Sequence, residues 1–458
     1  MQDKNPLIEE VCAQGQAALR AGDHSRAGEY FRRALEIDAE NLPANAGLGL
    51  ALLLSQSFAE SMPFLEQAAA GMPTDPMVLE ALGIAYVHVG RSAEAELVLR
   101  KALRFGRNNP ETLANLSAAL NENGKFDEAE KMLRNCLRRE PGHLQARHNL
   151  SLLQLLKGDF EQGWPGFELR NAAANRALPV WAQRCGAPDW HGENLQGRCI
   201  VLYAEQGLGD TIQFARYANP LAAQGATVII QCQPALMEIL RMIDGVSQVL
   251  STDDIAGNVD YKASLLSLPV LLNTVEDNIP GTAPYLRAAQ DEHDRWSGGF
   301  AALSDRPKVG LVWAGNPDNK TDHKRSIALH RFVPLLERPD IFVMSLQVGA
   351  AASQVDELLV AHKPYVLFPE TRPLGEVAAV LENLDLLITV DTALAHLAGA
   401  LNVPVWTLIA HFPDWRWMLN RDDTPWYPSM RLFRQPTPGN WDAVIAEVCQ
   451  ALDKRNFD

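Results

Sequence analysis

The chain has 458 residues, of which 47% are hydrophobic and 21% charged, and its formal net charge is −15. This composition argues against large-scale disorder, and the negative charge argues against a general binder of nucleic acid or of anionic membranes. The six cysteines are scattered without a C-x-x-C pair and predict neither a zinc site nor a disulfide framework. Because no stretch has the length and apolar character of a signal sequence or a membrane span, we expect a cytoplasmic protein of two or three domains.

The first third of the sequence repeats every 34 residues. One set of small residues, one set of large apolar residues and two further sets of small residues keep this interval: Gly15, Gly49, Gly83, Ser117 and Ser151; Phe31, Leu65, Leu99, Leu133 and Phe167; Ala27, Ser61, Ala95, Ala129 and Gly163; Ala34, Ala68, Ala102 and Cys136. Turn glycines share the register, with Gln56 in the missing place: Gly22, Gly90, Gly124 and Gly158. Small residues let two antiparallel helices approach closely, and large ones fill the space between neighbouring pairs. The pattern resembles the tetratricopeptide repeat and predicts an all-α solenoid.

A solenoid of this kind offers a concave groove for a protein or peptide, although a dimerisation arm or a spacer is the alternative. Asn115 and Asn149 occupy the same repeat position on two first helices. They resemble part of the asparagine ladder with which O-GlcNAc transferases bind peptide backbone. Gly47 and Ala81 fill this position in the two preceding repeats, so any ladder is short.

The repeat pattern changes near residue 164. Trp164-Pro165-Gly166 would break the second helix of the fifth repeat, because proline cannot continue a helix. We therefore expect about five repeats within residues 1–170. Residues 171–197, with several prolines and glycines and two tryptophans, are expected to form a packed linker.

From Cys199 onward, apolar strand-like runs alternate with helical stretches. The runs are CIVLYA, ATVIIQC, VGLVWAG, IFVMSLQ, LLITV and VPVWTLI. Apolar strands separated by helices predict parallel sheets covered on both faces. We expect two such units, residues 198–305 and 306–440, with ligands bound at the carboxyl ends of their strands.

The first polar strand end is YAEQGLGDTIQF. Gly207 and Gly209 permit a tight turn and close approach of the backbone to a ligand, and Asp210 and Thr211 can cap the following helix. Ile212 stands where a dinucleotide fingerprint needs its third glycine, which disfavours an NAD site. Two interpretations stay open for Asp210, namely a simple N-cap or a general base that faces an interdomain cleft.

The second polar strand end is WAGNPDNKTDHKRSIAL, which follows VGLVW. Lys320, Lys324 and Arg325 surround the flexible Gly315-Asn316-Pro317 segment. Three cations at the end of a strand in an acidic protein are suited to neutralising a diphosphate, although a solvated loop is the alternative. We include Asn316 and also Gln347, at the end of the run IFVMSLQ, among the expected donor-site residues.

The third polar strand end is LLITVDTALAHLAG. If its helix begins at Thr392, Asp391 is the N-cap, and the N–H groups of residues 392–394 point outward as an anion site. His396 lies four residues beyond Thr392 and therefore on the same helix face. An ordinary cap and a packing histidine are the alternatives. Aromatic residues in the loop that follows either stack on a base or sugar or simply pack: Trp415, Trp417, Trp426 and Tyr427.

These segments resemble the ADP-heptose heptosyltransferase family. VDTALAHLAGALNVPVW is similar to that family's donor-site helix, with the pattern D-[TS]-x-x-x-H-L-A, and GLGD resembles the turn that carries its proposed base. The resemblance implies that Asp210 is the base. It also implies that Thr392, Ala393 and their backbone amides bind the donor diphosphate, with His396 beside them. Ala393 replaces the family's usual glycine, which narrows the phosphate site.

The family's phosphate-contacting lysine falls on Arg325, with Lys324 adjacent. The sequence lacks G-x-x-x-x-G-K-[ST], G-x-S-x-G, H-E-x-x-H and any D-x-D pair, so we expect no metal and no other cofactor. With its repeats, the chain resembles bacterial tetratricopeptide-containing glycosyltransferases, some of which modify proteins such as flagellins. This implies an α+α/β chain: a solenoid, then a GT-B fold with the acceptor half first and the nucleotide half second. A C-terminal helix, residues 441–458, is expected to cross back onto the first half.

Our first hypothesis is a metal-independent, inverting glycosyltransferase that moves a sugar from a nucleotide-sugar to a hydroxyl on a protein presented by the repeats. A non-catalytic repeat adaptor that still binds nucleotide is the second hypothesis. A transferase acting on lipopolysaccharide sugars is the third. Whether the chain forms a homo-oligomer stays open.

Overall fold

The computed structural model describes residues 5–174, 176–254, 256–281, 283–319, 321–368, 370–455 and 457. Lys320, one of the expected phosphate-site cations, lies outside these residues. The chain divides into two compact units, Met1–Leu153 and Gln154–Asp458. In the described part of the chain, no helix combines the length and the apolar character that a membrane span requires.

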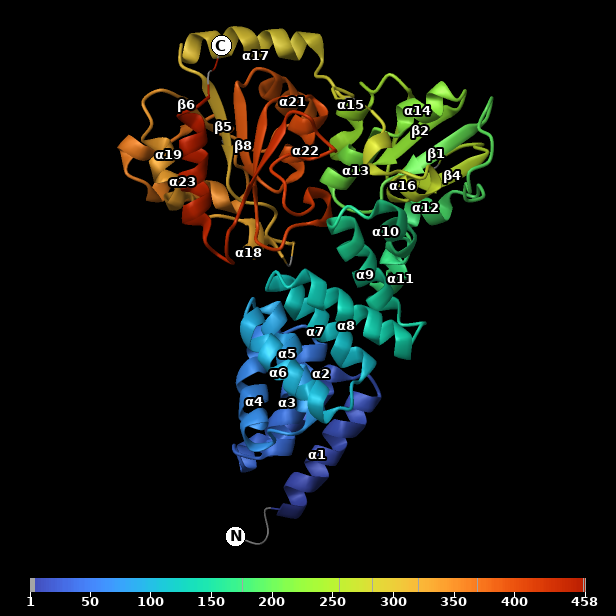
Figure 1. Cartoon of the computed structure of the whole chain (residues 1–458), viewed down its shortest axis with the longest axis vertical. Helices are drawn as coiled ribbons and strands as arrows, with labels where there is room; N and C mark the ends of the chain where they lie inside the picture. The colour runs from blue at the N-terminus through green and yellow to red at the C-terminus, as the bar shows by residue number, and fades with distance from the viewer. Residues whose placement is uncertain are drawn as a thin grey trace. The chain divides into compact units, whose positions relative to one another are not determined.

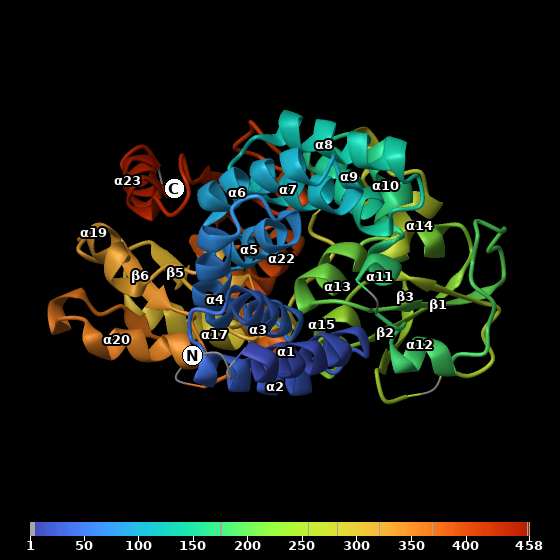
Figure 2. The same cartoon turned by 90° about the horizontal axis from the view of Figure 1, so that it is seen from below.

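The first unit is a stack of antiparallel helix pairs (Figures 1 and 2). Its helices are α1 (Asn5–Arg20), α2 (His24–Ile37), α3 (Leu42–Leu54), α4 (Phe58–Gly71), α5 (Pro76–His88), α6 (Ser92–Phe105), α7 (Pro110–Glu122), α8 (Phe126–Arg139) and the start of α9 (Leu144–Leu156). Asp75 and Asn109 cap α5 and α7, and each is followed by a proline, whose missing N–H needs no partner at the first helical position.

The 34-residue pattern is explained by contacts inside each pair. A β-carbon on Gly49 would come within 2.6 Å of Leu65, and one on Gly83 within 2.4 Å of Leu99, so the small residues face the large ones. The other small sets are fully buried: Ala27, Ser61, Ala95, Ala129, Ala34, Ala68, Ala102 and Cys136. The turn position has a left-handed backbone, which Gln56 adopts with a φ of 64°. The predicted solenoid is thereby confirmed.

The last repeat ends inside the second unit. α10 (Phe160–Phe167) continues through Pro165, so the helix ends later than we expected from Trp164-Pro165-Gly166. The ring of Trp164 lies 5.2 Å from that of Trp415, and the ring of Phe160 lies 6.0 Å from that of Trp426. The solenoid was expected to span residues 1–170. The first compact unit instead ends at Leu153, because the aromatic face of α10 packs in the second unit.

The second unit is built from parallel strands and helices. Its further helices are α11 (Arg170–Ala173), α12 (Val180–Arg184), α13 (Leu208–Ala215), α14 (Ala218–Ala223), α15 (Met237–Leu240), α16 (Leu268–Leu271), α17 (Gln290–Leu303), α18 (Asp322–Arg325), α19 (Val333–Leu336), α20 (Gln354–Glu357), α21 (Leu374–Glu382), α22 (Ala393–Ala400) and α23 (Trp441–Leu452). Its strands are β1 (Cys199–Tyr203), β2 (Thr227–Cys232), β3 (Val246–Ser251), β4 (Tyr261–Ser264), β5 (Lys308–Val312), β6 (Phe342–Ser345), β7 (Tyr365–Val366), β8 (Leu386–Val390), β9 (Val405–Ile409) and β10 (Met430–Arg434).

The described strands form two all-parallel sheets, which confirms the predicted α+α/β class. Sheet A has the order β3-β2-β1-β4, and sheet B has the order β10-β9-β8-β5-β6-β7. β8 and β9 are buried at every position, as expected for strands covered on both faces. The three polar segments follow β1, β5 and β8, which are internal strands, and β5 pairs directly with β8. We call the parts around the two sheets the sheet A half and the sheet B half.

The expected linker packs along the edge of sheet A. The backbone N–H of Trp190 donates to the Lys262 carbonyl of β4 at 2.8 Å. The indole of Trp181, in α12, donates to the Ala204 carbonyl just after β1 at 2.9 Å.

Two helices differ from the expected domain plan. The C-terminal helix does not cross back onto the first half: α23 packs on sheet B beside β10 and α19, with Val444 and Val448 fully buried there (Figure 1). Its apolar stripe completes the core over the strands of that sheet, which explains the position. α17, which we placed in the first half, packs on α21, where Arg295 pairs with Glu376 at 3.1 Å.

Candidate active site

The site lies where α13 of the sheet A half meets α22 of the sheet B half (Figure 1). At this contact a β-carbon on Gly209 would come within 2.6 Å of the His396 ring. We expected Gly209 to let a ligand approach the backbone. The structure instead places His396 against it, so this glycine lets the two halves approach each other.

Asp210 is not the N-cap of its helix. α13 begins at Leu208 with Gly207 as N-cap, and Asp210 is the third helical residue, whose Oδ2 accepts from the Gly207 N–H at 2.9 Å. Its Oδ1 accepts from the Arg416 guanidinium, with which it forms an ion pair. The Asp210 side chain is 17% exposed, so the carboxylate lies at the boundary between protein and solvent.

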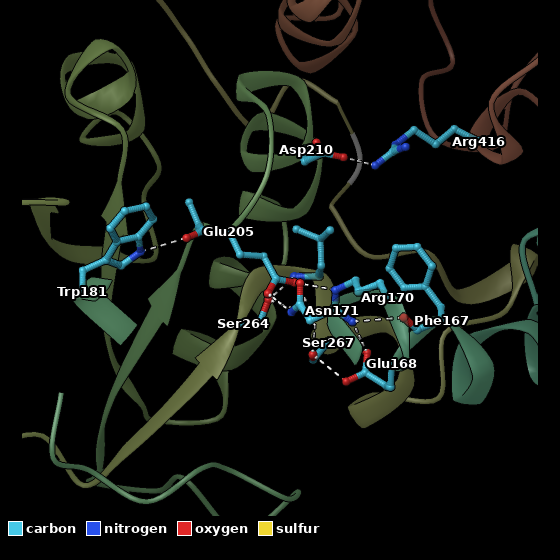
Figure 3. Close-up of polar contacts among 12 residues, drawn as sticks. Phe167, Glu168, Arg170, Asn171, Trp181, Glu205, Asp210, Ser264, Ser267 and Arg416 are labelled. Carbon is cyan, nitrogen blue, oxygen red and sulfur yellow. Dashed lines mark hydrogen bonds and ion pairs between the residues drawn. The ribbon is translucent and has the colours of Figure 1, made fainter. Parts of the chain in front are cut away.

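Arg416 is the residue that sequence reasoning missed. It belongs to the short helix η7 (Trp415–Trp417) of the sheet B half, and its side chain is 9% exposed. Its Nη2 bonds Asp210, its Nη1 bonds Asp414 at 2.8 Å and its Nε bonds Gln213. Figure 3 shows its guanidinium facing Asp210. An arginine between two tryptophans of an aromatic loop is a usable signal, since a buried guanidinium needs carboxylate partners.

Charges from both halves set the ionisation of this cluster. Burial raises the pKa of Asp210, and the Arg416 charge and the Gly207 N–H only partly offset this effect. Burial and the neighbouring Asp414 raise the pKa of Asp391 to about 6. Burial disfavours the charged form of Arg416, but Asp414 and Asp210 outweigh it and raise the pKa of the guanidinium, which stays charged.

The start of α22 lies one residue later than expected. Thr392, not Asp391, is its N-cap. The Thr392 hydroxyl makes no capping hydrogen bond to the helix backbone and lies 3.2 Å from the hydroxyl of Thr389. The outward-pointing N–H groups therefore begin at Ala393. Thr392 and Ala393 are both partly exposed, as a ligand site at this helix start requires.

Arg325 connects the basic segment after β5 to the end of β8. Its Nη1 donates to the Asp391 carbonyl at 2.8 Å, and its Nε donates to Asp322 at 3.0 Å. A β-carbon on Gly315 would come within 2.7 Å of the guanidinium, so the glycine makes room for it. Lys324 precedes Arg325 in α18. The geometry brings the expected cation beside the helix start of α22.

The side chains of two other expected donor-site residues accept hydrogen bonds from backbone N–H groups of nearby loops. The Gln347 side chain is buried, and its Oε1 accepts from the N–H groups of Trp313 and Ala314 at 3.1 and 2.9 Å. Asn316 is exposed, and its Oδ1 accepts from the Asp318 N–H at 3.1 Å. Gln347 thus positions the end of β5, and Asn316 closes a turn in the segment after it.

His396 is a buried, neutral imidazole. Its Nδ1 lies 2.9 Å from the Tyr427 hydroxyl, and its ring stacks on Trp417 with centroids 5.3 Å apart. Burial and the nearby Arg416 charge lower the pKa of His396 well below its ordinary value. Trp417, Trp426 and Tyr427 are at most 1% exposed. The interpretation that these aromatic residues stack on a base or sugar is therefore wrong, and they pack.

A second buried ion pair fixes the end of β1. Glu205, two residues after β1, pairs with Arg170 of α11, and their side chains are 1% and 5% exposed. Arg170 also donates to the hydroxyls of Ser264 and Ser267, as Figure 3 shows. Within the described residues, no group of three or more His, Cys, Asp and Glu side chains is placed to hold a metal ion.

In the first unit, the two asparagines of the expected ladder lie on α7 and α9 and are partly exposed. The side-chain amide of Asn115 donates to Glu80 of α5 at 3.0 Å, and the side-chain Oδ1 of Asn149 accepts from the Gln145 side chain at 2.8 Å. Each amide thus keeps one polar contact within the solenoid.

Family models match two parts of the chain. A model for the tetratricopeptide repeat matches residues 11–141, and one for glycosyltransferase family 9 (heptosyltransferase) matches residues 342–438. The second range contains Asp391, Thr392, His396 and Arg416, whereas Asp210 and Arg325 lie outside it.

Protein FlbA of Caulobacter vibrioides is 25% identical over 324 residues, which cover 65% of this chain and 53% of FlbA. The chain thus spans about half the length of this relative. Among solved structures, YrrB, "a TPR protein with an unusual peptide-binding site", is 19% identical, with 38% of this chain and 93% of YrrB covered and a TM-score of 0.32. MamA from Desulfovibrio magneticus RS-1 is 14% identical, with 38% and 96% covered and a TM-score of 0.32. The chain thus combines a segment that matches the tetratricopeptide repeat with a later segment that matches glycosyltransferase family 9 (heptosyltransferase).

Proposed function

We propose that the chain is a metal-independent, inverting glycosyltransferase that moves a sugar from a nucleotide-sugar to a hydroxyl of a protein in the cytoplasm. The observation that carries the proposal is that the Asp210 carboxylate of the sheet A half lies close to the start of α22 in the sheet B half, the proposed anion site. Asp210 directly follows Gly209, which touches His396 in the first turn of α22. A base and a donor phosphate on these two elements would flank one reaction centre.

Asp210 acts as the general base in this proposal. Each oxygen of its carboxylate has a second lone-pair position beyond the bonds to Gly207 and Arg416. The acceptor O–H gives its proton to Asp210 as its oxygen bonds to the anomeric carbon of the donor sugar, and the bond from that carbon to the nucleotide phosphate breaks. A single displacement of this kind inverts the anomeric centre.

The leaving nucleotide is stabilised at the start of α22. The N–H groups of Ala393 and Leu394, with the partly exposed Thr392 hydroxyl beside them, suit a diphosphate. Arg325, placed beside Asp391, supplies positive charge as the phosphate leaves, with Lys324 next to it. This is the task that a metal performs in other transferases, so we expect transfer to continue in the presence of EDTA.

The acceptor we propose is a protein, of which flagellin is the example, bound through the repeat groove with Asn115 and Asn149. Support comes from the repeats themselves and from the resemblance to repeat-containing transferases that modify proteins. A lipopolysaccharide sugar as acceptor would assign no role in substrate binding to this solenoid, and we therefore prefer the protein.

Nucleotide binding is the first test. A thermal-shift panel with ADP, UDP, GDP, CMP and their sugar derivatives should give one family of ligands that stabilises the chain. A ligand at about 100 times its Kd adds roughly 2.7 kcal/mol, enough to move the midpoint by several degrees. Thr392→Trp should abolish that shift by filling the helix start. Absence of a shift with every nucleotide would favour the non-catalytic adaptor.

Transfer itself is the second test. Asp210→Asn should reduce transfer from the stabilising donor to flagellin by about 100-fold or more while leaving the nucleotide shift in place. Normal turnover by this variant would refute the role of Asp210.

A further inference from the structure

We propose that Arg416 is a positioning residue: from the sheet B half it holds the Asp210 carboxylate of the sheet A half, so that the base is fixed only where the two halves are docked. This inference rests on the proposed role of Asp210 as base. Arg416 touches Asp210 and not the reacting atoms, so its effect passes through that carboxylate.

The contacts of Arg416 match this role. Asp210 and Gln213 are three residues apart and therefore on one face of α13, and the guanidinium bonds both of them. The carboxylate of Asp414, two residues from Arg416, accepts a hydrogen bond from the third guanidinium nitrogen, Nη1, at 2.8 Å. With three nitrogens engaged and a side chain only 9% exposed, the guanidinium has one orientation relative to α13. A fork held in this way fixes the position of Asp210 Oδ1.

The charges around Asp210 show why a cation is needed there. Burial, Asp414 and Glu205 all disfavour the ionised carboxylate, whereas Arg416 and the Gly207 N–H favour it. Glu205 has its own partner in Arg170, and Asp414 shares Arg416 with Asp210. Loss of the Arg416 charge would leave Asp210 and Asp414 to repel each other, and Asp210 would keep its proton at higher pH.

The same loop offers a matched control. Arg421 pairs with Glu276 of the sheet A half at 2.6 Å and with Asp423 of its own loop. Arg421→Gln therefore removes another ion pair between the two halves without touching Asp210. An effect that comes only from looser docking of the halves would appear in both arginine variants.

The first experiment needs no substrate. The full chain, labelled with carbon-13 at its aspartate carboxyl carbons, is titrated by NMR, and Asp210 is identified as the signal missing from Asp210→Asn. In Arg416→Gln, the pH at which Asp210 is half-ionised should rise by about 1 to 3. Arg416→Lys keeps the charge and should raise this pH less; it also replaces Arg416→Gln if that variant does not fold. Arg421→Gln should leave the pH of half-ionisation unchanged. An unchanged Asp210 signal in both Arg416 variants overturns the proposal.

The second experiment measures transfer. Arg416→Gln should lower kcat at pH 7 by about tenfold or more, keep the donor KM within about twofold and regain activity as the pH rises, because Asp210 then ionises. Equal losses in Arg416→Gln and Arg421→Gln with unchanged pH profiles would show a docking contact alone and overturn the proposal. Normal transfer by Asp210→Asn would instead refute the proposed role of Asp210 as base, while the titration still decides whether Arg416 holds Asp210.

Discussion

Gly209 and His396 are in contact so close that residue 209 has no room for a side chain: a β-carbon there would lie 2.6 Å from His396 Cδ2. The histidine ring is itself held from behind by Trp417 and Tyr427. The distance between Asp210 and the helix start at Thr392 therefore depends on a glycine of α13 and an imidazole of α22, which belong to different halves of the second unit.

Gly209→Ala should weaken the docking of the two halves. The added methyl group meets a ring that cannot move away, so we expect a loss of about 1–3 kcal/mol in the free energy of unfolding, measured in urea. Gly257→Ala is the control, because a β-carbon at that position would have no described atom within 4 Å. Equal stability of the two variants would mean that α13 and α22 move apart at little cost.

Asp391→Asn should change how stability depends on pH. The pKa of Asp391 is about 6 in the folded chain and 3.8 ordinarily, so the folded chain holds this proton more tightly than the unfolded chain. That contribution is present at low pH and is lost as the pH rises from about 4 to about 6. The free energy of unfolding of Asp391→Asn, minus that of the natural chain, should therefore be higher at pH 7.5 than at pH 4.5, by at most about 3 kcal/mol.

Urea unfolding at both pH values measures this change. Asp423→Asn is the control: the side-chain bond with Arg421 lowers the pKa of Asp423, which is then ionised in both states at both pH values. Its effect on stability should be the same at pH 4.5 and 7.5. A pH-independent effect of Asp391→Asn would show that the pKa of Asp391 is not raised by burial.

Glycine-to-alanine substitutions in the solenoid should raise or lower stability according to the side chain that each glycine faces. Gly83→Ala forces a methyl group against Leu99 at 2.4 Å and should cost about 1–3 kcal/mol. Gly28→Ala, in α2, meets its nearest neighbour, the end of the Arg32 side chain, at 3.5 Å and should stabilise its helix by about 0.5–1 kcal/mol. Thermal unfolding of the two variants separates these directions, and similar shifts would contradict the small-against-large packing inferred from the 34-residue interval.

Much of the fold follows from residue types at fixed positions. A small residue such as Gly83 is needed wherever two helices cross, so the repeat is visible in sequence at every crossing. The apolar runs at β1, β5 and β8 are buried strands, and each polar segment directly follows one of them. These relationships are local in the chain, which is why the sequence contains them.

Contacts between distant segments could not be predicted in this way. Asp210 and Arg416 are 206 residues apart, and no local pattern shows that they meet. The starts of α13 and α22 differ from the predicted ones because Gly207 and Thr392 cap them without a side-chain bond to the helix. α23 has an apolar stripe that suits either half, and only its packing on sheet B shows which half it joins.

Asn115 and Asn149 provide the test of acceptor binding. If their amides bind peptide backbone, replacing both with alanine removes two hydrogen bonds worth about 1–3 kcal/mol together, which weakens binding of the acceptor protein by roughly 5- to 150-fold. The nucleotide thermal shift should not change, because the asparagines lie in the first unit and the proposed donor site in the second. Asn135→Ala, on the second helix α8, is the control and should bind normally. Since Asn115→Ala also removes a bond to Glu80, the melting temperature is measured alongside, and weakened binding counts only at unchanged stability. Unaltered acceptor binding by the double variant would leave the solenoid as a spacer or dimerisation arm.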